Sequence, residues 1–140
     1  MSKNDYLDHL ASVPLFAACA KNDLKLVARR AEHVRVAEGK ELVSEGKPGH
    51  EFFVIANGKA AVRRKGRKIA TLGKGDYFGE LALLDRAPRN ASVVADSDME
   101  LFVLGQREFS GLLDEVPGLA HKLLAGMARR LRDADAKNVN

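Results

Sequence analysis

The residues best suited to chemistry lie in one short segment, residues 78–92. It places the carboxylate of Glu80 and the guanidinium of Arg89 within ten positions of each other, directly after Gly79. A carboxylate accepts a hydrogen bond from a hydroxyl, and the planar fork of arginine can give a phosphate two charge-assisted hydrogen bonds. Gly79 has no side chain, so a ligand can approach the backbone closely there. This combination predicts a site for a ligand that carries both a hydroxyl and a phosphate.

The residues after Glu80 add backbone donors to this site. Glu-Leu-Ala-Leu-Leu, residues 80–84, are good helix formers. The first N–H groups of a helical turn have no partner within the helix and attract an anion. Pro88 then restricts the backbone directly before Arg89, which helps to aim that side chain.

The simplest alternative is a helical turn followed by an exposed arginine, with an ion pair between Glu80 and Arg89. That explanation suits most isolated Glu and Arg residues. The full run, Phe-Gly-Glu-Leu-Ala-Leu-Leu together with Pro-Arg-Asn-Ala-Ser, is far more specific than an isolated pair. We therefore interpret it as a binding site.

This run resembles the phosphate-binding cassette of the cyclic nucleotide-binding domain family. That family includes bacterial catabolite activators, the regulatory subunits of protein kinase A and the gating domains of some channels. The resemblance implies that Glu80 binds the ribose 2′-hydroxyl and that Arg89 binds the exocyclic phosphate oxygens. It also implies a shell of backbone groups from Gly79, Leu81, Ala82 and Asn90.

The same resemblance implies a pocket for the base. Val62 and Ile69 stand where the family lines the purine pocket with apolar side chains, and Leu72 is a further candidate. Asn90 occupies the position at which a threonine favours cGMP in the eukaryotic kinases. We therefore expect cAMP as the ligand, with cGMP as the alternative.

The end of the chain resembles the C-terminal helix of the bacterial activators, at Met-Ala-Arg-Arg-Leu, residues 127–131. Two turns later those proteins offer Thr-Ser to the adenine, whereas this chain has Ala134-Asp135. Arg130 and Asp135 are therefore the candidates for capping the base. The activators continue into a helix-turn-helix DNA reader, which does not occur before Asn140, so no nucleic-acid partner is expected from this chain alone.

Short β-type segments punctuated by glycine occupy the middle of the chain and predict a small barrel or sandwich. The predicted strands are residues 33–36, 41–43, 52–56, 60–64, 68–72, 92–95 and 99–104. Helical periodicity marks residues 6–10 and 21–30, and later 107–116 and 117 to about 136. Asn22 or Asp23 is the expected N-cap of the second helix.

The predicted fold class is mostly β with flanking helices. The family resemblance specifies a double-stranded β-helix (jelly-roll) barrel with N-terminal helices and two C-terminal helices. One domain is expected over residues 1–140, since this length supports a single core. Its expected parts are N-terminal helices at about 1–32, a β-roll at 33–104 that contains the cassette at 78–92, and C-terminal helices at 107–138.

Composition is ordinary for a soluble globular protein, with 46% hydrophobic and 30% charged residues. No apolar run approaches the length of a transmembrane helix, and the polar first residues do not resemble a signal peptide. The lone Cys19 rules out an internal disulfide and suits a reducing compartment. These features favour a cytoplasmic location without a transmembrane segment. The net charge of +4 is too small to indicate nucleic acid by itself.

The strongest charge cluster is Arg-Arg-Lys-Gly-Arg-Lys, residues 63–68. The simplest interpretation is a solvated hairpin tip around Gly66, since charge runs usually mark exposed turns. The alternative is a docking surface for an acidic partner or an anionic lipid. Aromatic residues do not interleave with the run, so the stacking platform of a single-strand nucleic-acid binder is missing.

A metalloenzyme of the cupin type is the competing structural interpretation, because it uses the same kind of barrel. Such a site needs clustered His and carboxylate ligands, whereas the four histidines of this chain are scattered. The glycines of residues 73–79 have the wrong spacing for a dinucleotide fingerprint, and no Gly-Lys pair precedes Ser or Thr as in a P-loop. We therefore expect neither a metal nor enzyme activity.

The preferred interpretation is a regulatory module that couples nucleotide binding to movement of its C-terminal helices and acts on an unknown effector protein or fused domain. One alternative is an interaction or structural domain of the same fold with weak or no nucleotide binding. Another is the sensor part of a DNA-binding regulator without its reader domain. An apolar stripe on the last helix should pack on the barrel or on another subunit, which allows a homodimer. Its members are Leu119, Leu123, Met127 and Leu131.

Overall fold

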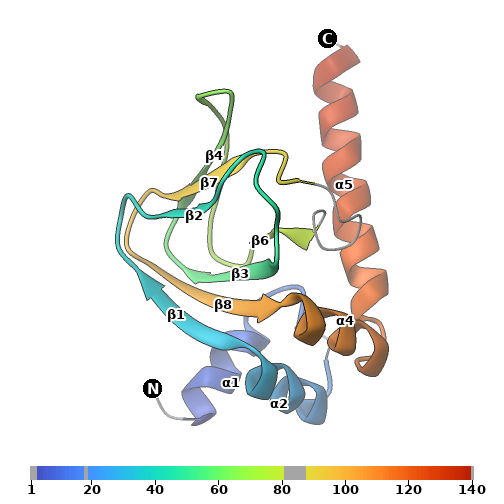
Figure 1. Ribbon diagram of the computed structural model, residues 1–140. Helices are drawn as coiled ribbons and strands as arrows, with labels where there is room; N and C mark the ends of the chain where they lie inside the picture. Colours follow the sequence, from blue (N-terminus) through green and yellow to red (C-terminus); the bar gives the residue numbers. More distant parts are fainter. Residues whose placement is uncertain (1–2, 18, 81–87, 140) are drawn as a thin grey trace.

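A computed structural model describes residues 3–17, 19–80 and 88–139, with the side chains of residues 7–17, 19–80 and 88–133. Within these ranges, short antiparallel strands form a barrel with helices on one end and along one side (Figure 1). The helices are α1 (Lys3–Ala11), α2 (Lys21–Arg30), α4 (Gln106–Glu115) and α5 (Leu119–Val139). The strands are β1 (Glu32–Val36), β2 (Glu41–Val43), β3 (Glu51–Asn57), β4 (Ala60–Arg64), β5 (Arg67–Leu72), β6 (Tyr77–Phe78), β7 (Ser92–Ala95) and β8 (Met99–Gly105). This architecture confirms the predicted fold class.

Two four-stranded sheets make up the barrel, in the orders β1-β8-β3-β6 and β2-β7-β4-β5. Strand β3 is buried along its whole middle because both of its faces are covered. Phe52 and Val54 pack toward the helices, whereas Phe53 and Ile55 pack among residues of the other strands. Alternate side chains of a strand point to opposite faces, so a strand covered on both faces is apolar at every position.

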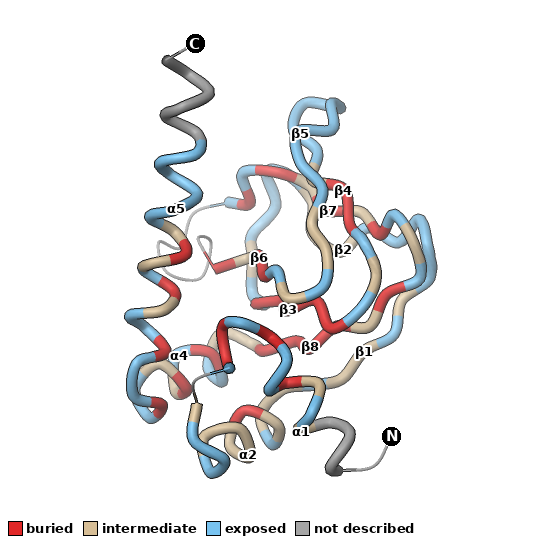
Figure 2. The backbone as a smooth tube through the Cα atoms, turned by 180° about the vertical axis from the view of Figure 1, so that it is seen from behind, coloured by how far each residue is buried: buried red, intermediate tan, exposed pale blue. Residues whose placement is uncertain are grey.

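Helix α5 joins the core at its first two turns only. Leu119 and Leu123 are buried, Met127 is half-buried, and Leu131 is 65% exposed. Beyond the core the helix runs alongside the barrel and past it, which Figure 2 shows as a change from red to blue along α5. Of the two predicted alternatives, packing on the barrel holds for Leu119 and Leu123 but not for Leu131, and contact of the stripe with another subunit stays a prediction. Among the described helices, none has the length and apolar character that crossing a membrane requires.

The predicted strands agree with the observed ones to within one residue at each end. The sequence prediction missed β6, which pairs with Phe53 and Val54 of β3, because a two-residue strand has no readable period. Directly before β6 the chain makes a tight turn at two glycines. Gly75 has φ +90° and the Asp76 N–H donates to the Gly73 carbonyl over 3.0 Å.

The predicted N-cap of the second helix is wrong. Helix α2 begins at Lys21, and Ala20 is its N-cap without a side-chain hydrogen bond. Asp23 instead lies in the first turn, where a carboxylate interacts favourably with the helix dipole. The hydrophobic face of α2, not a capping side chain, holds the helix in place, since Val27 belongs to the core and Leu24 packs against it.

Candidate functional site

Strand β6 leads into the candidate site, and Gly79 follows it directly. The φ angle of Gly79 is +97°, which side chains rarely adopt. A Cβ atom at this position would lie 2.7 Å from Nη1 of Arg89 and 2.7 Å from the carbonyl oxygen of Glu51. Both the backbone conformation and the lack of space therefore require glycine here.

Main-chain groups hold Arg89 in place. Its side chain is buried, with Nη1 donating to the Gly79 carbonyl over 2.8 Å and Nη2 to the Glu51 carbonyl over 2.7 Å. Its own backbone pairs with the loop before β3, because the Arg89 N–H donates to the Lys47 carbonyl and the Arg89 carbonyl accepts from the Gly46 N–H. The guanidinium is thus clamped between two segments that lie far apart in the sequence.

Burial lowers the pKa of Arg89, and the charges of Glu51 and Glu80 oppose that shift. The ordinary pKa of an arginine lies far above neutral pH, so the guanidinium stays charged. A guanidinium has five N–H donors, of which the two main-chain hydrogen bonds use two. The remaining donors are what Arg89 can offer to an anion.

The carboxylate of Glu80 is the second buried charge of the site and is 2% exposed. Its Oε1 accepts a hydrogen bond of 2.7 Å from Nη1 of Arg130. Burial raises the pKa of Glu80, while the charge of Arg130, a backbone hydrogen bond and the charge of Arg89 act in the opposite direction. A raised pKa means that the folded state binds the proton more tightly than the unfolded state. The ionised carboxylate therefore lowers stability at neutral pH, and this cost disappears as the pH falls through the folded pKa.

Arg130 connects this carboxylate to helix α5. Its Nη2 donates to the carbonyl oxygen of Tyr77 over 2.5 Å, and its guanidinium lies 4.6 Å from the centre of the Tyr77 ring. Arg130 thus makes an ion pair, a main-chain hydrogen bond and a cation–π contact with residues 77–80. These contacts tie α5 to the start of the cassette.

The structure brings together four of the predicted site residues: Gly79, Glu80, Arg89 and Arg130. Glu80 and Arg89 form no ion pair with each other, so the simple ion-pair alternative does not describe their side chains. Leu81 and Ala82 lie outside the described residues, as does the side chain of Asp135.

The other predicted residues lie on or beside the β4–β5 hairpin. Val62 is half-buried on β4, and Ile69 on β5 is 46% exposed. Asn90 is exposed, and its carbonyl oxygen accepts a hydrogen bond of 3.0 Å from Nε of Arg64. No hydrogen bond in the described part of the chain links Val62 or Ile69 to the two buried charges.

Sequence reasoning missed three contributors to the site: the Glu51 carbonyl, Tyr77 and Arg64. The Glu51 carbonyl comes from β3 and has no signature, because every residue carries the same main-chain group. Tyr77 had a usable signal, since it is an aromatic residue two positions before Gly79. Arg64 was noted only as part of the basic run.

Tyr77 supplies a prediction about stability. Its hydroxyl is buried without a hydrogen-bond partner among the described residues and lies against Gly126 of α5. Because a buried polar group without a partner costs about 1–3 kcal/mol, Tyr77→Phe should leave the free energy of unfolding unchanged or raise it by up to that amount. Urea unfolding measures this difference.

The matched comparison is Tyr77→Leu, which also removes the ring. The ring of Tyr77 packs against Phe52 at 5.7 Å and beneath Arg130, so this variant should lose stability. A clear destabilisation by Tyr77→Phe would contradict the view that its hydroxyl is unpaired.

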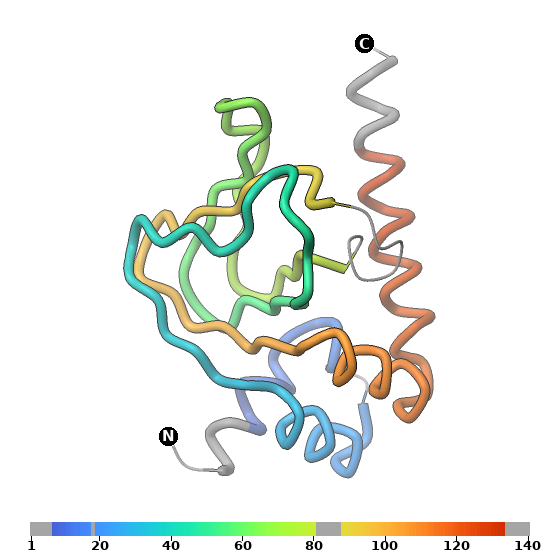
Figure 3. Tube along the Cα trace, in the orientation of Figure 1, coloured from blue at the N-terminus to red at the C-terminus, as the bar shows by residue number. Residues whose placement is uncertain are grey.

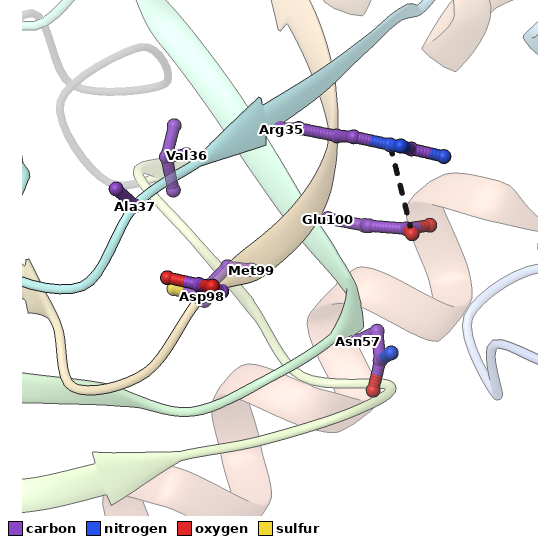
Figure 4. Close-up of a pocket in the computed structure, with 7 residues that line it drawn as sticks. All are labelled: Arg35, Val36, Ala37, Asn57, Asp98, Met99 and Glu100. Carbon is purple, nitrogen blue, oxygen red and sulfur yellow. Dashed lines mark ion pairs between the residues drawn. The ribbon is translucent and has the colours of Figure 1, made fainter.

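A separate open cavity of about 430 Å³ lies between β1, the end of β3 and the start of β8 (Figure 4). Arg35, Asn57 and Glu100 are among its lining residues, and no cassette residue is. Arg35 and Glu100 pair over 3.8 Å, and Glu100 also pairs with His33. Asp98 adds a second acidic side chain to the lining, and its one basic residue already pairs with Glu100, so this cavity is a weaker candidate for a phosphate than the cassette. In the described part of the chain, no group of three or more His, Cys, Asp or Glu residues is placed to hold a metal ion.

A jelly-roll barrel with a clamped arginine and a buried glutamate at one cassette defines a class of protein. The chain belongs to the cyclic nucleotide-binding domain family, whose model matches residues 33–116. The match covers the strands of the barrel from the second residue of β1 onward, the cassette and α4. It therefore confirms the family resemblance of the sequence.

Three known proteins illustrate what the chain is similar to. A cAMP-dependent protein kinase regulatory subunit of Hypocrea atroviridis is 37% identical over 117 residues, which are 84% of this chain and 25% of that protein. The crystal structure of the Thermus thermophilus catabolite activator protein matches with a TM-score of 0.81 and 36% identity, over 89% of this chain and 61% of that one. The regulatory domain of Toxoplasma gondii PKA, solved with cAMP, matches with a TM-score of 0.77 and 26% identity, over 91% of this chain and 49% of that one. This chain thus spans between a quarter and about three fifths of these relatives.

Proposed function

We propose that this domain is a non-catalytic regulatory module that binds a cyclic nucleotide at the cassette, cAMP in preference to cGMP. The observation that carries the proposal is the burial of two opposite charges. Among the described side chains, Glu80 and Arg89 are the charged residues that are buried, and both belong to the cassette. Burying a charge costs free energy, and an ion pair between these two side chains does not offset that cost. Ligand binding therefore explains these two residues better than stability does.

Each of the two buried charged side chains has hydrogen-bonding atoms left for a ligand. The donors of Arg89 that the main chain does not use suit the exocyclic oxygens of a cyclic phosphate. A carboxylate has roughly four lone-pair sites, and Arg130 takes one of those of Glu80. The ribose 2′-hydroxyl can therefore donate to Glu80 while the ion pair with Arg130 stays in place.

The preference for cAMP and the position of the base rest on less direct support. Ile69 is one of few large apolar side chains that are exposed among the described residues, and it lies on β5 next to β4, which carries Val62. Stacking a purine against these side chains would remove apolar surface from water. The cAMP in the Toxoplasma gondii domain and the name of the Hypocrea atroviridis relative support cAMP, and cGMP remains the alternative.

The proposed signal passes through α5. Arg130 contacts Glu80 directly, so a change at the ribose site reaches α5 through one ion pair. A ligand shifts a conformational equilibrium only when it binds one arrangement more tightly than another. In this proposal, the arrangement with Arg130 on Glu80 is the one that binds cAMP more tightly.

The receiver of the signal is an effector protein or a fused domain. Leu124 and Leu131 are 63% and 65% exposed and lie seven positions apart, so they share one face of α5. A homodimer through this face remains a prediction, as does a cytoplasmic location.

Calorimetric titration with cAMP and with cGMP tests the proposal. We expect cAMP to bind more tightly than cGMP, and Glu80→Gln to weaken cAMP binding by roughly ten-fold, the value of one hydrogen bond to a charged group. Glu32→Gln, an exposed carboxylate on β1, is the matched control and should not change the affinity. If neither nucleotide binds the folded domain, the alternative of an interaction domain without ligand replaces this proposal.

A further inference from the structure

The strongest cluster of positive charge in this chain is the basic tip, which we define as Arg63, Arg64, Lys65, Arg67 and Lys68. The whole chain has a formal net charge of +4, and the tip alone carries five positive charges. The rest of the chain therefore carries one more acidic than basic residue. The tip is thus the densest run of positive charge in the sequence and produces a strongly positive local field.

The basic tip stands clear of the barrel. All of its residues are exposed, and the β4–β5 hairpin that bears them projects from the end of the barrel opposite α1 and α2 (Figures 1 and 3). Lys68 pairs with Asp96 over 3.6 Å, and Nε of Arg64 donates to the Asn90 carbonyl. Within the part of the chain that the structure describes, the side-chain cations of Arg63, Lys65 and Arg67 form no ion pair. Three cations thus remain for an external partner.

The geometry of the turn between β4 and β5 does not explain why its first residue is a lysine, Lys65. Lys65 and Gly66 have φ angles of +53° and +78°, which is the two-residue hairpin turn that favours Asn, Asp or Gly. A lysine is unfavourable in this left-handed conformation. Its N–H donates to Oε1 of Glu45 over 2.9 Å, which anchors the turn. The turn therefore presents its cations on a fixed backbone.

We infer that the basic tip is a docking surface for an acidic segment of a partner protein. Neighbouring residues of a strand point to opposite faces, so Arg63 and Arg64 on β4 place positive charge on both faces of the hairpin. An acidic loop or groove can enclose both faces, whereas a flat membrane reaches only one side of a narrow hairpin. The slightly negative remainder of the chain also disfavours the extended phosphate surfaces of membranes and nucleic acids. This inference does not depend on nucleotide binding.

The experiment measures binding of a fluorescein-labelled decaglutamate peptide to the full chain by fluorescence anisotropy. The test variant is Arg63→Glu/Lys65→Glu/Arg67→Glu. The matched control is Lys21→Glu/Lys40→Glu/Lys74→Glu, which changes the net charge equally at three exposed lysines outside the tip. The tip variant should lose at least about ten-fold in affinity and the control less than about three-fold, because close charge pairs dominate such contacts. Binding should also weaken with added salt.

Equal losses in the two variants would overturn the inference, since net charge and not the tip would then explain binding. Phosphatidylserine vesicles and duplex DNA are titrated in parallel. Tip-dependent binding to either of these, without binding to decaglutamate, would also overturn it. If the charge reversal prevents folding, Arg63→Gln/Lys65→Gln/Arg67→Gln replaces it, with the matching glutamine variant of the control and the same expected order.

Discussion

Replacing Arg89 by alanine should weaken cAMP binding by roughly 30-fold or more, in a domain that still folds. Removing one partner of a buried charge pair typically costs about 2–5 kcal/mol, and about 1.4 kcal/mol corresponds to ten-fold in affinity. The loss should exceed that of Glu80→Gln, because Arg89 is expected to meet a charged phosphate and Glu80 a neutral hydroxyl. Calorimetric titration of both variants measures the two losses and their order.

Two further variants separate the charge of Arg89 from its geometry. Arg89→Lys keeps a positive charge but cannot hold the Gly79 and Glu51 carbonyls with one planar fork, so its affinity should fall between wild type and Arg89→Ala. Arg107→Ala removes an exposed arginine on α4 and should leave the affinity unchanged. An affinity of folded Arg89→Ala equal to that of wild type would refute the assignment of the phosphate site.

Removing Arg130 should weaken cAMP binding by about ten-fold, within the usual range of coupling free energies. Without Arg130, the buried carboxylate of Glu80 loses the charge that most strongly opposes the rise in its pKa. A larger fraction of Glu80 is then protonated and accepts a ribose hydrogen bond less well. Arg130→Met tests this directly, and deletion of the residues after Met127 should have an effect at least as large.

The neighbouring arginine provides the control for that experiment. Arg129 is exposed and has no ion pair in the described part of the chain, so Arg129→Met should bind cAMP like wild type. Amide exchange then tests whether α5 responds to the ligand. We expect slower exchange over Leu119 to Ala134 with saturating cAMP, because the nucleotide should stabilise the docked helix. Identical exchange with and without cAMP would mean that the domain binds the nucleotide without any response of α5.

The candidate site shows which of its residues a local sequence pattern can predict. Gly79, Glu80 and Arg89 are close in sequence, so a local motif predicts them together. Arg130 was one of two candidates on the last helix, and the sequence did not indicate that it would pair with Glu80, 50 positions away. Contact at that separation depends on where α5 docks, which follows from the packing of Leu119 and Leu123 and not from any local pattern.

By itself, the sequence determined the order of the helices and of every described strand except β6, the cassette motif and the exposed basic hairpin, because periodicity, glycine turns and charge runs act over a few residues. The tertiary structure alone decided that the Glu51 carbonyl clamps Arg89, that Glu80 faces Arg130, and that Leu131 lies in solvent. Each of these outcomes depends on how segments that are distant in the sequence are arranged by sheet pairing and helix docking. Main-chain carbonyls and helix positions have no residue-type signature, so their contribution to the site emerges only when the barrel closes.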